Sequence, residues 1–90
     1  MAAIERQKVI TSFPNHAKVV AKSDTVNLTD YAGAERAMYI FVGTAGTVRC
    51  LPAADTTPVD VVLPDGGYVP FAVIRVYNTG TTATNMLAVW

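Results

Sequence analysis

From Ala37 onward the chain consists of short apolar, β-branched runs separated by turn residues. This pattern is typical of an all-β domain, because alternating strands and helices would need longer helical patterns between the strands. The pattern predicts strands over residues 38–42, 47–51, 59–63, 71–78 and 84–89. With one to three weaker strands added, such a count fits a small antiparallel β-sandwich or barrel.

Two of these stretches give more detailed expectations about burial. Residues 38–42 are apolar at every position, so they predict a central strand that is covered on both faces. Residues 59–63 alternate, which directs Val59, Val61 and Leu63 inward and leaves Asp60 to solvent or a partner.

The last sixteen residues, 75–90, have the pattern of a hairpin. Thr79–Thr82 supplies the turn, and residues 84–89 are expected to return beside residues 71–78. Residues 86–90 are almost wholly apolar, so this end of the chain must pack into its own core or against another subunit.

The first 22 residues mix charged and apolar residues without a sustained period, and Phe13-Pro14-Asn15 breaks any helix. We therefore expect an extended N-terminal arm over residues 1–22 and a β domain over residues 23–90. The pairs Val9-Ile10 and Val19-Val20 are consistent with short strands laid on the domain or on a neighbour. Asp30 could cap a helical turn that extends to Ala37.

Composition favours a protein that is buried in an assembly. The 90 residues make one domain, and only 16% of them are charged, against about 25% in ordinary soluble domains. Seven basic residues balance seven acidic ones, so direct binding to nucleic acid or to a membrane is not expected. No secretory signal or spanning segment is recognisable, which predicts synthesis in the cytoplasm.

The sequence offers no set of residues for catalysis or metal binding. His16 is the single histidine and lies in the predicted arm, without an evident partner for acid–base chemistry. Cys50, the single cysteine, falls in a predicted strand and is expected to behave as a small buried hydrophobe. Asp55, Asp60 and Asp65 fall in a loop, a strand and a turn and need not converge. We expect no catalytic residue, no metal and no cofactor.

The threonine-rich tip, Thr79 to Thr84, carries hydroxyls that could bind a sugar. Tyr77 is the only aromatic residue beside it, and hydroxyls without convergent groups do not define a pocket. Carbohydrate or receptor binding is therefore the alternative expectation for function.

Three tracts carry a resemblance to a known family: Ser23-Asp24-Thr25, residues 37–48 with their Gly43-Thr44-Ala45-Gly46 turn, and residues 75–85 with Thr-Gly-Thr-Thr-Ala-Thr. Together they resemble the head spike base proteins of bacteriophages and gene transfer agents. The resemblance covers about residues 23–90, and the threonine tract is its most specific part.

The resemblance implies a virion structural protein on the capsid surface, made in the host bacterial cytoplasm, which serves as a head spike base or as a decoration (cement) subunit. Together with the charge-poor composition and the apolar C-terminal strand, the resemblance predicts these partners: further copies of the chain, as a trimer or pentamer, the major capsid protein and a fibre protein. Extended termini and buried aromatic residues would form the contacts. The predicted contact residues are Phe13, Val19, Val20, Tyr77, Met86, Val89 and Trp90. The alternative is a carbohydrate- or receptor-binding module of a phage tail or fibre.

Overall fold

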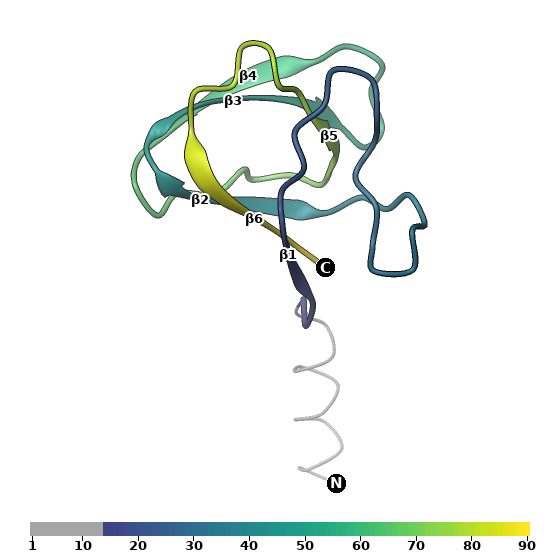
Figure 1. Ribbon diagram of the computed structural model, residues 1–90. Helices are drawn as coiled ribbons and strands as arrows, with labels where there is room; N and C mark the ends of the chain where they lie inside the picture. Colours follow the sequence, from purple (N-terminus) through teal and green to yellow (C-terminus); the bar gives the residue numbers. More distant parts are fainter. Residues whose placement is uncertain (1–13) are drawn as a thin grey trace, which may run out of the picture.

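The computed structural model describes residues 14–90, which form six antiparallel strands and no helix (Figure 1). The strands are β1 (Ala17–Val19), β2 (Tyr39–Thr44), β3 (Gly46–Pro52), β4 (Val59–Leu63), β5 (Val73–Val76) and β6 (Thr84–Val89). They make two three-stranded sheets with the orders β1-β6-β2 and β4-β3-β5. The predicted all-β class is confirmed, and of its two forms the structure is a small sandwich and not a closed barrel.

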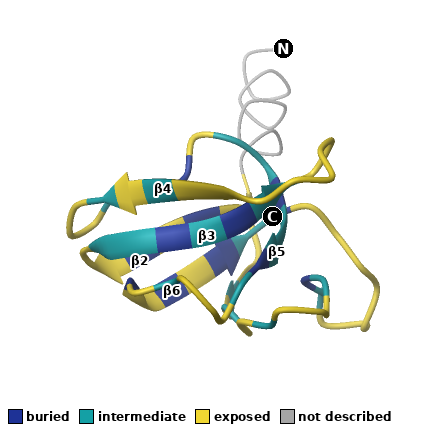
Figure 2. Ribbon diagram, turned by 90° about the horizontal axis from the view of Figure 1, so that it is seen from above, coloured by how far each residue is buried: buried dark blue, intermediate teal, exposed yellow. Residues whose placement is uncertain are grey.

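The core lies between the two sheets and is built from alternate positions of their strands. Ile40 and Val42 of β2 are buried together with Met86 and Ala88 of β6, and Figure 2 shows the alternation of buried and exposed residues along both strands. The other sheet supplies mainly short β-branched side chains and Cys50. Burial of each large apolar side chain contributes about 1.5–3 kcal/mol.

The segment that leads into β5 joins the two sheets. Val69 donates its N–H to the carbonyl of Ile40 at 2.9 Å, and Met38 and Val73 exchange both of their backbone hydrogen bonds, at 2.8 and 2.7 Å. The edge of β2 that faces away from β6 is therefore partly covered by this segment.

The predicted hairpin over residues 75–90 is wrong. β6 pairs with β1 and β2, whereas β5 pairs with β3. The reason lies in the connection between the two strands: Tyr77 N–H bonds the carbonyl of Arg49 at 2.8 Å, and Thr82 N–H bonds that of Thr47 at 2.8 Å. The connection thus follows β3 and delivers the chain to the opposite sheet, which a tight turn could not do.

The expectation that residues 38–42 are covered on both faces is also wrong. β2 lies at the end of its sheet, and Tyr39 and Phe41 remain exposed on the side away from the core. An entirely apolar run cannot reveal that only one of its faces meets a second sheet.

Residues 59–63 follow the predicted alternation with one exception. Val61 and Leu63 pack against the core, whereas Val59, at the start of β4, is exposed. Asp60 faces solvent as expected and there accepts hydrogen bonds from Arg49.

Asp30 caps a tight turn and no helical turn forms. One of its carboxylate oxygens accepts the N–H groups of Ala32 and Ala34, at 2.9 and 3.1 Å. Thr29 and Glu35 then close the turn as an isolated antiparallel bridge. The short side chain satisfies the turn directly, so no further helical residues are needed.

The described part of the predicted arm belongs to the sandwich. Residues 1–13, with Val9-Ile10 and Phe13, lie outside the described residues, while residues 17–19 form β1 on the domain's own sheet. Asn15 and His16 both donate their N–H groups to the carbonyl of Trp90 at 2.8 Å, and Trp90 returns one bond to His16 at 3.0 Å. The imidazole ring of His16 stacks on the indole ring of Trp90, with the ring centroids 5.2 Å apart. This His16–Trp90 clasp fixes the start of β1 beside the end of β6.

Candidate interaction face

The outer surface of the β1-β6-β2 sheet carries a row of large apolar side chains. The strand register places Val19 of β1 opposite Leu87 of β6, and Leu87 opposite Phe41 of β2. Their exposed fractions are 73%, 43% and 43%. Tyr68 extends the row, since it forms a bridge with Phe41 and the two ring centroids lie 5.6 Å apart. Four strand segments therefore contribute to one continuous apolar row.

A second row lies beside the first on the same face of the sheet. Ala17, Val89 and Tyr39 are paired across the three strands, each two residues along its strand from a member of the first row. Side chains two residues apart share one face of a strand. Next to this row, residues 14–17 line a shallow hollow of about 450 Å³ together with Phe41 and Val89.

We refer to these seven side chains as the apolar face; they are Ala17, Val19, Tyr39, Phe41, Tyr68, Leu87 and Val89. None of them is charged, and five are large side chains with more than two fifths of their surface exposed. Contiguous apolar surfaces of this kind are typical of sites that contact a protein, a membrane or a ligand. The face is also rigid, because every row is fixed by strand pairing.

The outer surface of the second sheet differs in chemistry. Arg49 of β3 and Asp60 of β4 form a two-pronged ion pair, with distances of 2.8 and 3.2 Å. Hydrogen bonding from Arg49 lowers the pKa of the Asp60 carboxyl. Val62, with 79% of its area exposed, is an apolar residue on this surface, and Thr47 is paired with it across the two strands. The sandwich thus has one apolar and one polar outer face.

The structure places only part of the predicted contact residues on the apolar face. Val19 and Val89 belong to it, and Trp90 adjoins its end through the clasp. Val20 packs against the core, and Met86 is buried with 5% of its surface exposed.

Tyr77 lies beyond the end of β5, on the other sheet, where the guanidinium of Arg75 lies 5.6 Å from its ring centroid.

The contact residues predicted from the sequence do not include five members of the face, which are Ala17, Tyr39, Phe41, Tyr68 and Leu87. The apolar run 38–42 predicts a strand covered on both faces, so it gives no sign that Tyr39 and Phe41 are exposed. Leu87 alternates with the buried Met86 and Ala88, and that period of two was the available signal.

Three of the four hydroxyls of the threonine tip form hydrogen bonds within the domain. Thr79 donates to the Asp24 carboxylate at 2.7 Å, Thr81 accepts the N–H of Arg49 at 3.0 Å, and Thr82 accepts that of Thr47 at 2.9 Å. The tract therefore attaches the β5–β6 connection to β3 and to the loop at Asp24. These contacts do not favour the alternative expectation of a glycan-binding tip.

The remaining candidates from the sequence are dispersed. Cys50 is buried in the core, and burial raises the pKa of its thiol to about 11. Within residues 14–90 no three histidine, cysteine, aspartate or glutamate side chains come together as a set that could hold a metal ion. No helix long and apolar enough to span a membrane occurs in the same residues.

The fold and its surface define the chain as a small β-sandwich with one apolar outer sheet face. No protein-family model and no curated protein matches the chain.

Proposed function

We propose that this chain is a bacteriophage virion structural protein of the capsid surface, a head spike base or decoration (cement) subunit. The observation that carries the proposal is the apolar face, which no other described part of the chain covers. The resemblance of residues 23–25, 37–48 and 75–85 to head spike base proteins supplies the class of assembly. In this role the face contacts further copies of the chain, as a trimer or pentamer, or the major capsid protein.

The composition of the apolar face suits a permanent contact. Aromatic side chains such as Phe41 and Tyr68 are rigid and bury a large apolar area, and residues of this type carry much of the energy at interfaces. Because strand pairing already fixes the rows, little conformational entropy is lost when a partner binds. Each Å² of apolar surface removed from water contributes about 25 cal/mol.

Because the two outer faces differ in chemistry, they would orient the subunit on the capsid surface. With the apolar face toward the shell or a neighbouring subunit, the Arg49–Asp60 ion pair on the other sheet points to solvent. An exposed ion pair of this kind contributes little stability but keeps a surface hydrated. A fibre protein would then meet the polar face or the loops at its rim.

The test compares Leu87→Glu with the matched control Val62→Glu, since both residues are exposed apolar side chains within a strand and lie on opposite sheets. Both variants are checked for folding by circular dichroism. Light scattering then gives the solution mass, and co-sedimentation with capsids gives attachment. We expect Leu87→Glu to lose self-association or capsid attachment by at least about tenfold, because a buried charge must be desolvated. Val62→Glu should retain both.

A wild-type chain that stays monomeric at high concentration and does not attach to capsids would contradict the proposal. Equal losses in both variants would also count against it, because the apolar face would then have no special role.

A further inference from the structure

A second hollow adjoins β1 and is lined by Lys18 and Val19 of that strand. It has a volume of about 270 Å³ and lies between β1 and the chain that follows it, residues 21–29. Leu28, Met38 and Ala88, three core residues, line its floor. We call this hollow the β1 pocket.

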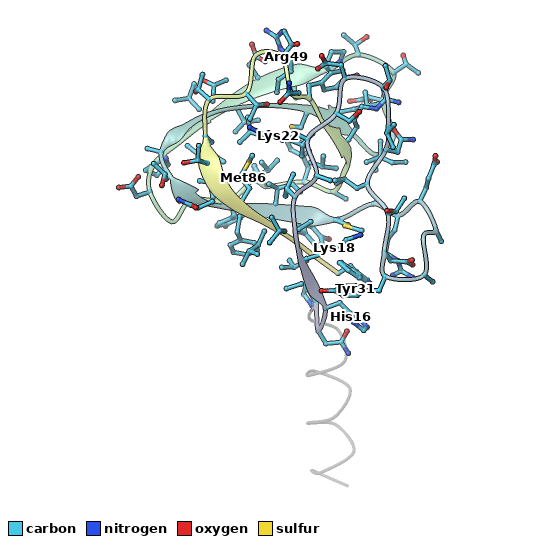
Figure 3. All side chains as sticks on the ribbon, viewed as in Figure 1. His16, Lys18, Lys22, Tyr31, Arg49 and Met86 are labelled. Carbon is cyan, nitrogen blue, oxygen red and sulfur yellow. The ribbon has the colours of Figure 1, made fainter. Side chains whose placement is uncertain are left out.

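Two lysines line the β1 pocket. Lys18 belongs to β1 and Lys22 to the chain that leads away from it, and both are labelled in Figure 3. Lys18 Nζ donates to the carbonyl of Thr29 at 3.3 Å and lies 5.7 Å from the ring centroid of Tyr31. Lys22 is exposed and has no ion-pair partner within residues 14–90.

No acidic side chain lines the β1 pocket, although Asp24, Asp30 and Glu35 adjoin its lining residues. The carboxylate of Asp30 pairs with Arg36 at 3.5 Å. The carboxylate of Asp24 is turned toward Thr79, from which it accepts two hydrogen bonds. The carboxylate of Glu35 accepts a hydrogen bond from the amide of Asn27 at 3.3 Å. The pocket therefore combines an apolar floor with two lysine side chains, and no carboxylate among its lining residues pairs with them.

The size of the pocket limits what it can hold. Pockets for small molecules and cofactors usually measure about 300–1,000 Å³, and the β1 pocket is smaller, at about 270 Å³. It has room for one large apolar side chain, as in the anchor pockets at the centre of protein interfaces. Its lysines favour a carboxylate beside that side chain.

We infer that the β1 pocket is a binding site for an acidic-apolar segment of a partner protein, with one leucine- or phenylalanine-sized side chain on the floor and an adjacent carboxylate near Lys18 and Lys22. Val19 belongs to both the pocket and the apolar face. A partner that covers the face therefore reaches the pocket without a gap. That the partner is a virion protein rests on the proposed function, whereas the chemistry of the pocket does not.

The test uses nuclear magnetic resonance titration of the full chain with the dipeptide N-acetyl-Glu-Phe-amide. Its neutral analogue, N-acetyl-Gln-Phe-amide, is the matched probe. We expect shifts of the methyl signals of Leu28, Met38 and Ala88. Binding of the neutral probe should be roughly two- to fivefold weaker, as one exposed ion pair contributes no more than this.

The variant Lys22→Gln should reduce the difference between the two dipeptides, because only Lys18 then remains beside the carboxylate. The control Arg36→Gln removes the same charge from an exposed side chain that does not line the pocket, so the difference should persist. Absence of shifts at these three residues, or equal binding of both dipeptides by the wild-type chain, would overturn the inference.

Different results would contradict the proposed capsid function and the proposed β1 pocket. Leu87→Glu should leave dipeptide binding intact, because Leu87 does not line the β1 pocket. If capsid attachment is absent while the acidic dipeptide is preferred, the proposed function fails and the pocket stands. If attachment depends on Leu87 and neither dipeptide binds, the pocket fails alone.

Discussion

The carboxylate of Asp24 accepts two hydrogen bonds from Thr79, one from its N–H at 2.8 Å and one from its Oγ1 at 2.7 Å. The two residues are 55 positions apart in the chain. This contact joins the loop after β1 to the threonine tract between β5 and β6. It is the type of side-chain bond to a backbone donor that stabilises the ionised form of a carboxylate.

The Asp24–Thr79 contact predicts that the stability of the domain decreases at acidic pH. The hydrogen bonds from Thr79 lower the pKa of Asp24 from its ordinary value of 3.8. Stabilisation by Asp24 is therefore fully present above pH 3.8 and is lost as the pH falls through the lower pKa of the folded state. Asp24→Asn should lower the Tm at pH 7, and its difference from the wild type should shrink as the pH falls below 3.8.

Thermal denaturation between pH 7 and pH 2 measures this effect. Asp55→Asn is the control, because Asp55 is exposed in a loop and its carboxylate accepts no hydrogen bond from residues 14–90. A difference between Asp24→Asn and wild type that stays constant over the whole pH range would contradict the assignment.

Cys50 should resist modification in the folded protein. Burial raises the pKa of its thiol to about 11, so the reactive thiolate is scarce at neutral pH, and the side chain is shielded by the core. Iodoacetamide labelling at pH 8, followed by mass spectrometry, should be slow in buffer and fast in denaturant. Equal rates in the two conditions would show that the thiol is accessible in the folded state.

Met86 and Leu87 are neighbours in β6, but substitutions at the two positions should affect the stability of the domain very differently. Met86 is buried in the core and Leu87 lies on the apolar face. Met86→Ala should reduce the free energy of unfolding by about 2–5 kcal/mol, whereas Leu87→Ala should change it by less than about 0.5 kcal/mol. Urea denaturation checks both values, and a large loss in Leu87→Ala would place that side chain in the core.

Two deletions distinguish the N-terminal residues from β1. Removal of residues 1–13 should leave the Tm unchanged, because β1 and the His16–Trp90 clasp lie in the retained chain. Removal of residues 1–20 also deletes β1 and should lower the Tm by at least about 4 °C, which corresponds to roughly 1 kcal/mol in a domain of this size. Equal Tm values for the two shortened chains would mean that β1 contributes nothing to the sandwich.

The sequence predicted the fold class because strands and turns leave local signals. All five expected strands exist, and Thr79–Thr82 does lie between β5 and β6. The pairing of those strands was not predictable, since it depends on where the chain runs after Tyr77 leaves β5. Register and sheet order are decided by contacts between residues far apart in the sequence.

Predicting the interaction surface failed for a related reason. A run such as residues 38–42 is equally apolar on both sides, so composition cannot say which side meets the core. Only the position of β2 at the end of its sheet leaves Tyr39 and Phe41 on the outside. The β1 pocket also has no local signature, because Lys22, Leu28 and Ala88 come from separate parts of the chain.

The position of β6 also determines the order in which the domain can fold. β6 is the last strand along the chain, yet it lies between β1 and β2, and Ala17 is paired with Val89. During synthesis β1 and β2 therefore remain without their shared partner until residues 84–89 have left the ribosome. Such distant pairing slows folding, so we expect this sheet to form in one late step after the β3–β4 and β3–β5 pairs.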